Sequence, residues 1–590
     1  MADGRRVRRW WRPDPPGRCV RAEVVPRPDR FDLPDRFDRP DRFDRPDRFD
    51  LPDRFDRPDR FDRPDRFDLA VLVAFGGLSV WVLAILAARS GPDHVWLGTD
   101  GPFIGDQMQY LGFIVDAARH VLVADPFRSV RPAGVYLHPG LVLSGLLVRA
   151  GVSPAAAYLA WKPVAVVGLF AAVRGYSRSL LVSPAARRVA LVLGLFAISP
   201  TAVLLQHAGG LAGPDRVSLQ AMATDLWPGL YLWGYPFTAL AVAALPAALL
   251  AYGRDRADGR IRGWAPTAGL LCAWLQPWQG ATLLAVLVVS EAALWRSGRR
   301  PWGLLAANAA AVAAPLLYYF GLSRLDTTWA HAGRADLVTF PWPPLALTLA
   351  PLVLAALFAC RRRPRSFAQT ALRVWPAAGL AVYAAITVGH VGTFPLHALQ
   401  GLGIPLAVLS VEGAWSLRAQ LGGPGLLWGA VAAVTALAVV AAFAVQLDSA
   451  RSIGRAQLGQ PGPYYLTAGE QAALVALRRN PIPGAVLAPV GIGETVPEET
   501  GRQTWVGIAS WTPHFDRRVL QADQLFSGRL APAAARRLVL GSRARFLLSD
   551  CAHHAPLAGT LGPLVAQVRH FGCATVYRLR SGGHPLRPGR

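Results

Sequence analysis

The residues best suited to chemistry on a substrate gather in one short segment near residue 100. Asp106 begins the run Asp106-Gln107-Met108-Gln109-Tyr110, and an amphipathic helical pattern continues from it to His120. A carboxylate in the first turn of a helix is favoured in its ionised form by the helix dipole, and such an acid suits the role of a general base. The alternative interpretation is that Asp106 only caps the helix. Asp100, six residues earlier, is the nearest second acid.

Lys162 is the only lysine in the chain, and it interrupts an otherwise apolar run over residues 155–173. A charge inside a membrane is costly and is expected to have a partner. At 1.5 Å per residue, Lys162 is expected about 12 Å below the outer end of its helix. A lipid phosphate or an acid such as Asp106 would then be within its reach. Snorkelling or pairing with backbone carbonyls is the alternative.

Further polar side chains stand at the ends of apolar runs. His397 lies at the mouth of a predicted span, where it is expected either to cap a helix or to donate to a phosphate. Gln276 and Trp278 lie in a turn between two apolar runs, where a tryptophan is either an interfacial anchor or a platform for a sugar ring. The five cysteines show no CxxC or Cys/His spacing, so the sequence predicts no metal site.

The elements that must position these residues are apolar helices. The chain has 590 residues, of which 52% are hydrophobic and 17% charged, and its mean hydropathy of +0.28 excludes an ordinary soluble globular protein. Each span needs about 20 apolar residues. We predict an all-α polytopic bundle of about eleven transmembrane helices, near residues 69–88, 155–173, 189–206, 235–252, 264–277, 280–295, 302–321, 342–360, 373–389, 397–414 and 425–447. The runs 264–277 and 280–295 form either two short spans or one broken helix.

The charge distribution predicts the orientation of this bundle. The net charge is +24, and residues 69–447 hold 26 basic against 13 acidic residues. The basic residues occupy every second loop, namely 174–188, 254–262, 296–300, 361–365 and the loop around Arg418. This is the positive-inside pattern rather than a nucleic-acid-binding patch. We therefore expect a multi-pass protein of the cytoplasmic (plasma) membrane with a cytoplasmic N-terminus and an extracytoplasmic C-terminus, and no nucleic-acid partner.

The two ends of the chain differ from the bundle. Residues 1–68 contain seven copies of the hexapeptide Pro-Asp-Arg-Phe-Asp-Leu/Arg, the first at Pro28, and proline at every sixth residue predicts a disordered cytoplasmic tract. Residues 448–590 mix a helical pattern with short apolar runs, which predicts a small α/β domain. Cys551 and Cys573 lie in it on the disulfide-permissive side, so a bridge and two separate buried thiols are both open.

These features together resemble the polyprenyl-phosphate-sugar-dependent membrane glycosyltransferases of the GT-C fold. The resemblance covers residues 69–590: a cytoplasmic N-terminus with one span, a long outer loop with the early acid Asp106, many further spans, and an outer C-terminal domain. The segment Phe394-Pro395-Leu396-His397-Ala398-Leu399-Gln400-Gly401 resembles a late outer-loop element that often carries arginine in that family. His397 holds the place of the arginine here.

The resemblance implies an inverting transfer of sugar from a polyprenyl-phosphate donor to a glycan, lipid or protein acceptor at the outer face of the membrane. It implies Asp106 as base or acceptor orienter, with Asp100 as the second catalytic candidate, and a divalent cation is compatible with it. The candidate phosphate- and substrate-binding residues are Lys162, His397, Arg119, Gln107, Tyr110, Gln276 and Trp278. The alternatives are a transporter or lipid flippase, although no corresponding halves are found in the sequence, or a non-catalytic membrane scaffold.

Overall fold

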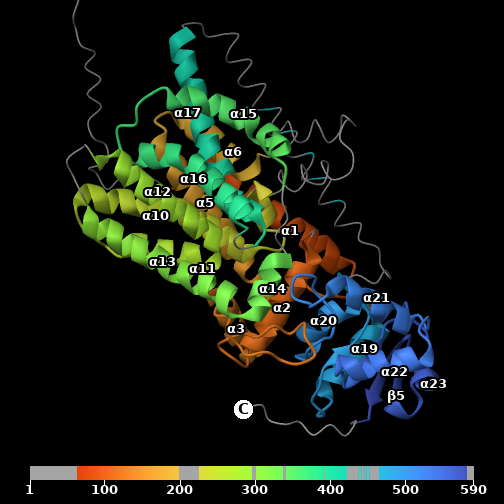
Figure 1. Ribbon diagram of the computed structural model, residues 1–590. Helices are drawn as coiled ribbons and strands as arrows, with labels where there is room; N and C mark the ends of the chain where they lie inside the picture. The colour runs from red at the N-terminus through yellow and green to blue at the C-terminus, as the bar shows by residue number, and fades with distance from the viewer. Residues whose placement is uncertain are drawn as a thin grey trace, which may run out of the picture. The chain divides into compact units, whose positions relative to one another are not determined.

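Helices lie at the predicted spans throughout the part of the chain that the structure describes (Figure 1). The computed structural model describes residues 63–101, 103–197, 225–226, 228–295, 301–335, 340–390, 393–421 and 464–580, together with a few single positions between 436 and 451. Most of the span predicted at 425–447, the loop at 296–300 and the first five hexapeptides lie outside these residues. The helices at the predicted spans are α1 (Arg66–Ala88), α5 (Trp161–Leu180), α6 (Pro184–Phe196), α10 (Pro236–Asp258), α11 (Trp264–Leu275), α12 (Pro277–Ala293), α13 (Trp302–Leu325), α15 (Trp342–Cys360), α16 (Phe367–Gly389) and α17 (Gly403–Leu421).

Among the described residues, six helical segments are long and apolar enough to cross a membrane. They are Arg66–Ala88, Pro154–Leu180, Pro236–Asp258, Trp302–Leu325, Trp342–Cys360 and Phe367–Gly389. Shorter apolar helices accompany them, among them Trp264–Leu275. The chain is therefore a multi-pass membrane protein, and the predicted count of about eleven spans stays a prediction.

The first helix begins inside the last hexapeptide. Asp65 is the N-cap of α1, and Asp65 and Asp68 form a reciprocal capping box, so the helix starts three residues before the predicted boundary at residue 69. Asp68 also pairs with Arg174 at 2.8 Å and with Arg178 at 2.7 Å, both on α5. A capping sequence and two ion pairs thus give one copy of the repeat a fixed structure.

The uncharged stretch from residue 264 to residue 295 forms two helices with a break at Gln276. α11 ends at Leu275 and α12 begins at Pro277, because Gln276 is extended and proline is favourable in a first helical turn. Gly280 of α12 packs so closely on Ala273 of α11 that a Cβ atom would overlap the alanine. The missing side chain therefore permits the close approach of the two helices.

The segment between α1 and α5 carries the candidate acids. It contains β1 (His94–Trp96), α2 (Ile104–Ala117), α3 (Pro139–Arg149) and the short α4 (Pro154–Leu159), after which the chain continues into α5. The predicted helix at residues 106–120 is present as α2, which begins two residues earlier and ends three residues earlier. Its buried side chains include Met108, Leu111 and Ile114, at helical spacing.

The C-terminal region is a small α/β domain, as its mixed pattern predicts. Its four-stranded sheet has the order β3 (Val486–Leu487), β4 (Phe546–Ser549), β6 (Ala574–Leu579), β5 (Val565–Phe571); the β3–β4 pair is parallel and the others are antiparallel. The accompanying helices are α19 (Ala468–Arg479), α20 (Val490–Thr500), α21 (Phe515–Phe526), α22 (Pro532–Ser542) and α23 (Leu557–Leu561). Cys551 and Cys573 form a disulfide in it.

Two contacts join this domain to the loop that carries the acids. β1 pairs antiparallel with β2 (Tyr465–Thr467), so that Trp96 lies opposite Tyr465. α20 packs against α2, as Figure 1 shows, and one buried apolar cluster includes Leu111 and Ile114 of α2 together with Val496 of α20. The C-terminal domain therefore packs against one side of α2.

Candidate functional site

Asp106 lies in the first turn of α2 and contacts a tyrosine from another segment. The hydroxyl of Tyr235, the residue before α10, donates to Asp106 Oδ2 at 2.6 Å. The N-cap of α2 is Phe103, which makes no side-chain cap bond. The capping interpretation would have Asp106 serve the helix start, whereas its hydrogen bond to Tyr235 leads away from the helix.

The surroundings of Asp106 combine access with desolvation. The residue is partly exposed to solvent. Burial of most of the carboxyl nevertheless raises its pKa, while the hydrogen bond from Tyr235 acts in the opposite direction. A raised pKa makes an ionised carboxylate a stronger base, which is the property that proton abstraction near neutral pH requires.

The charge of Asp106 acts on two further acids. Asp225 belongs to the segment before α10, and Glu494 lies on α20 of the C-terminal domain; both side chains are partly exposed. Burial raises the pKa of Asp225 to about 7 and that of Glu494 to about 8, and the charge of Asp106 adds to both increases. Three acids from three distant parts of the sequence therefore share one poorly solvated region.

The carboxylate of Asp225 accepts a hydrogen bond from a glutamine side chain. Gln400 donates to Asp225 Oδ1 at 3.2 Å, and the amide of Gln276 donates to Gln400 Oε1 at 3.3 Å. The predicted residue Gln276 thus belongs to a polar chain that leads to the acids, although it does not contact Asp106. Trp278 instead donates to Thr393 Oγ1 at 3.2 Å.

Asp100 and Lys162 form a buried ion pair with each other. Asp100 is fully buried, and the Lys162 side chain is 3% exposed. Lys162 also donates to the carbonyls of Ser79, at 2.9 Å, and of Leu232. The sequence suggested a lipid phosphate or an acid such as Asp106 as the partner of this lysine, with backbone carbonyls as the alternative. In the structure an acid, Asp100, and two backbone carbonyls are its partners. Only Ala160, whose backbone is helical, separates α4 from α5, so Lys162 lies eight residues after Pro154 within the apolar helical segment Pro154–Leu180.

Gln107 braces the backbone near Asp106. Its side-chain oxygen accepts from the backbone N–H of Asp100 at 3.0 Å. Its amide packs against Gly101 and Gly234, and a Cβ atom at either glycine would overlap it. Gly234 also has a φ of 110°, which side-chain-bearing residues rarely adopt. Gln107 therefore fixes the chain just before Tyr235.

Tyr110, His397 and Arg119 occupy three different environments. Tyr110 stacks on Tyr158 with the ring centroids 5.6 Å apart. His397 lies in the 3-10 helix η3 (Pro395–Leu399), where burial lowers its pKa to about 4, so it is neutral at pH 7 and supplies no positive charge. Arg119 follows the far end of α2 and donates to the carbonyl of Gly501 at 3.3 Å, about 20 Å along the helix axis from Asp106. Of the predicted phosphate- and substrate-binding residues, Gln107 and Tyr110 therefore lie beside Asp106 on α2, whereas Arg119 lies away from it.

The acids do not form a ligand set for a metal ion. Within the described ranges, no group of three or more His, Cys, Asp or Glu side chains is arranged to hold one. We therefore derive no step through a divalent cation.

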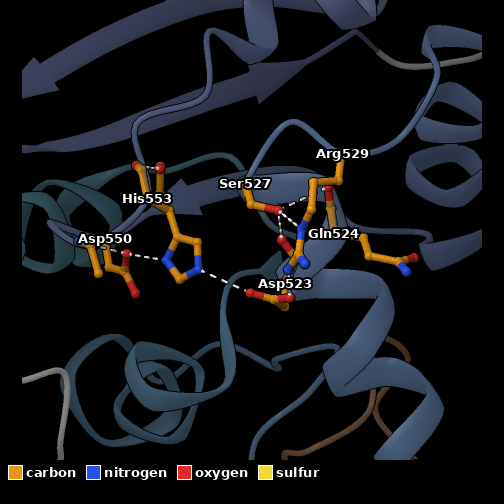
Figure 2. A network of polar contacts seen from close by, with 8 residues as sticks. Asp523, Gln524, Ser527, Arg529, Asp550 and His553 are labelled. Carbon is orange, nitrogen blue, oxygen red and sulfur yellow. Dashed lines mark hydrogen bonds and ion pairs between the residues drawn. The ribbon is translucent and has the colours of Figure 1, made fainter.

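A second polar network lies in the C-terminal domain, apart from α2. Figure 2 shows His553 between two acids, with its Nδ1 2.6 Å from Asp550 and its Nε2 3.6 Å from Asp523. Arg529 also pairs with Asp523 and contacts Ser527. These contacts connect the end of β4 to the end of α21, and we assign them to the stability of the domain.

Sequence reasoning identified Asp106 but not its partners. Tyr235 lies 129 residues away from Asp106, and Glu494 belongs to the other domain. Asp225 carried one available signal, because few acids occur between residues 69 and 447. Nothing in the local patterns of Tyr235 or Glu494 indicates that they approach α2.

Comparison with known proteins shows similarity at the level of solved structures. The chain is similar to the oligosaccharyltransferase AglB from Archaeoglobus fulgidus in complex with an inhibitory peptide and a dolichol-phosphate, at 14% identity and a TM-score of 0.39 over 88% of this chain and 75% of that one. It is also similar to ArnT from Cupriavidus metallidurans, at 13% identity and a TM-score of 0.46 over 86% and 98% of the two chains. The third example is the arabinofuranosyltransferase AftD from Mycobacteria, at 16% identity and a TM-score of 0.46 over 88% and 42%.

No protein-family model and no curated protein matches the chain. Structural similarities of this size do not identify equivalent residues. The roles of Asp106 and its neighbours therefore rest on the geometry of this chain alone.

Proposed function

We propose that this protein is an inverting membrane glycosyltransferase that transfers a sugar from a polyprenyl-phosphate donor to an acceptor hydroxyl, with Asp106 as general base. The observation that carries the proposal is an accessible acid in a desolvated site, held by Tyr235 on one oxygen. The donor class follows from the family resemblance of the sequence. The acceptor is a glycan, lipid or protein on the outer face of the membrane.

The chemistry requires a base beside the acceptor. Asp106 accepts the hydroxyl proton while the acceptor oxygen attacks the anomeric carbon from the side opposite the phosphate. The bond from that carbon to the phosphate oxygen breaks, polyprenyl phosphate leaves with the electron pair, and the configuration inverts. Because Tyr235 donates to Oδ2, the other oxygen of Asp106 is the one that receives the proton. The raised pKa favours this transfer.

The two neighbouring acids favour the ionised form of Asp106. With pKa values near 7 and 8, Asp225 and Glu494 hold protons for part of the time at neutral pH. Their protonation reduces the repulsion that an ionised Asp106 would otherwise experience. Asp100 takes no part in the proposed transfer, because its charge is committed to Lys162.

The test is Asp106→Asn, measured as sugar transfer from polyprenyl-phosphate-sugar donors by the purified full chain in liposomes. The variant keeps the shape of the side chain and its acceptor for Tyr235 but cannot take a proton. We expect transfer to fall by about 10²- to 10⁴-fold with donor binding retained. Asp326→Asn is the matched control, since Asp326 accepts from the N–H groups of Thr328 and Trp329 at the start of a helix away from the acids. Near-normal transfer by Asp106→Asn would remove Asp106 from the mechanism.

A further inference from the structure

A basic hollow lies at the end of the bundle where α1 begins. It is open to solvent and is lined by Asp65, Asp68, Arg174, Arg178, Arg187 and Arg188, among others. These side chains come from the start of α1, the end of α5 and the start of α6. Residues from three helices thus converge on one site, which the transfer chemistry at Asp106 does not use.

Among the described residues, the side chains that line the hollow carry a net positive charge. Asp68 pairs with Arg174 and Arg178, and Asp65 pairs with Arg188 at 3.0 Å. Four arginines against two carboxylates leave an excess of two positive charges on the lining. Such a cavity favours a group with delocalised negative charge, and guanidinium groups match the geometry of phosphate oxygens.

The surroundings of the hollow are apolar and exposed. Leu69 and Val73 lie one turn apart on α1, directly after Asp68, and are 49% and 73% exposed. Val182, in the link between α5 and α6, is 71% exposed. On a helix of a membrane bundle, exposed apolar side chains face the acyl chains of lipids. A ligand with a phosphate at one end and hydrocarbon at the other therefore fits both parts of this surface.

We propose that this hollow binds the phosphodiester headgroup of an anionic phospholipid, with the acyl chains along Leu69 and Val73. The headgroup would join α5 and α6 to the start of α1. Binding to the folded form would stabilise the bundle. The proposal is independent of sugar transfer and holds or fails whatever the role of Asp106.

The experiment uses the full chain purified in a neutral detergent. Native mass spectrometry measures the binding of phosphatidylglycerol and of phosphatidylcholine to the wild type and to Arg187→Gln/Arg188→Gln. We expect the wild type to prefer phosphatidylglycerol, and the double variant to bind it about tenfold more weakly or worse, with phosphatidylcholine unaffected. The melting temperature checks that the double variant is folded, because Arg187 also donates to the carbonyl of Leu181 at 2.6 Å; Arg188 and Asp65 are about half exposed, at 51% and 43%, and their pair contributes little to stability.

Two further variants sharpen the result. Arg362→Gln/Arg363→Gln removes the same charge from exposed residues after α15 and should leave phosphatidylglycerol binding unchanged. Asp65→Asn raises the positive charge of the hollow and should strengthen binding.

Three outcomes would overturn the proposal. The first is equal binding of the two lipids by the wild type. The second is an equal loss in the two arginine double variants, which would indicate diffuse surface charge. The third is displacement of phosphatidylglycerol by an equal concentration of inorganic phosphate, which would indicate a site for free phosphate instead of lipid.

Discussion

At the scale of single residues, Asp106 and Asp100 differ in their exposure to solvent. Both are acids in the same loop, yet Asp100 is fully buried against Lys162, whereas Asp106 is partly exposed and held by one tyrosine. A buried carboxylate paired with a lysine stabilises a structure only while both partners remain. An accessible carboxylate with a raised pKa can exchange protons with a substrate.

The Asp100–Lys162 pair predicts strongly non-additive mutations. Lys162→Met leaves an uncompensated carboxylate in the interior, and we expect the folded state to lose about 3 to 5 kcal/mol. Asp100→Asn combined with Lys162→Met removes both charges and should recover most of that loss. Thermal unfolding of the two variants in detergent measures the difference. A double variant as unstable as Lys162→Met would show that the two charges do not depend on each other.

Glu494 predicts a pH dependence of stability with a definite sign. Its pKa is raised from the usual 4.5 to about 8, so the folded protein binds this proton more tightly than the unfolded chain does. Stability therefore falls as pH rises from about 4.5 to about 8, and the cost is fully present above that range. Glu494→Gln should raise the melting temperature at pH 8.5 and change it little at pH 4.5.

Asp516→Asn is the control for this experiment, because Asp516 is an exposed acid in the first turn of α21. It should leave the pH dependence of the wild type unchanged. If Glu494→Gln gave the same melting temperature as the wild type at both pH values, the raised pKa of Glu494 beside Asp106 would be wrong.

The limits of sequence reasoning at this scale have a physical cause. The position of Asp106 in the first turn of a helix was predictable because a helix start is a local pattern. The choice of Asp100 as the acid beside Lys162 was not, because the two residues meet only through tertiary packing. Glu494 approaches α2 only through packing between the two domains, which no local pattern encodes.

At the scale of elements, the last hexapeptide shows how tertiary contacts give structure to a repeated sequence. Phe67 lies beneath the guanidinium of Arg188 at 5.2 Å, and Asp68 is 3% exposed between two arginines. The apolar pattern predicted the positions of the helices because a membrane span needs a long uncharged run. The break at Gln276 was visible in the sequence, whereas the close contact of Gly280 with Ala273 was not.

The start of α1 predicts a contrast between a large deletion and a single substitution. Replacing residues 1–60 with a start methionine removes five whole hexapeptides and half of the sixth but keeps the capping box, and it should leave folding and activity near the wild-type level. Asp68→Asn keeps the whole tract but leaves Arg174 and Arg178 without their carboxylate, at an expected cost of about 3 to 5 kcal/mol. The melting temperature and the yield of folded protein measure both effects. Loss of folded protein in the deletion would show a structural role for the tract.

At the scale of the whole molecule, the arrangement of the two domains constrains the membrane topology. β1 precedes the candidate acids and pairs with β2 of the C-terminal domain, and α2 packs against α20. The loop after α1 and the C-terminal domain must therefore lie on the same side of the membrane. Glu494 reaches the field of Asp106 only because of this arrangement. The alternation of basic loops led to the same conclusion independently, by parity.

This topology predicts the labelling of single cysteines placed in each segment, in a background without other free cysteines and with the Cys551–Cys573 bridge intact. A cysteine at Val121 in the first loop and one at Leu520 on α21 should react with a membrane-impermeant maleimide from the same side, since both positions are exposed. A cysteine at Ile261, exposed in the basic link between α10 and α11, should react only from the opposite side. If Leu520 labelled together with Ile261, Glu494 and Asp106 would lie on opposite faces of the membrane, and the three-acid site would have to be abandoned.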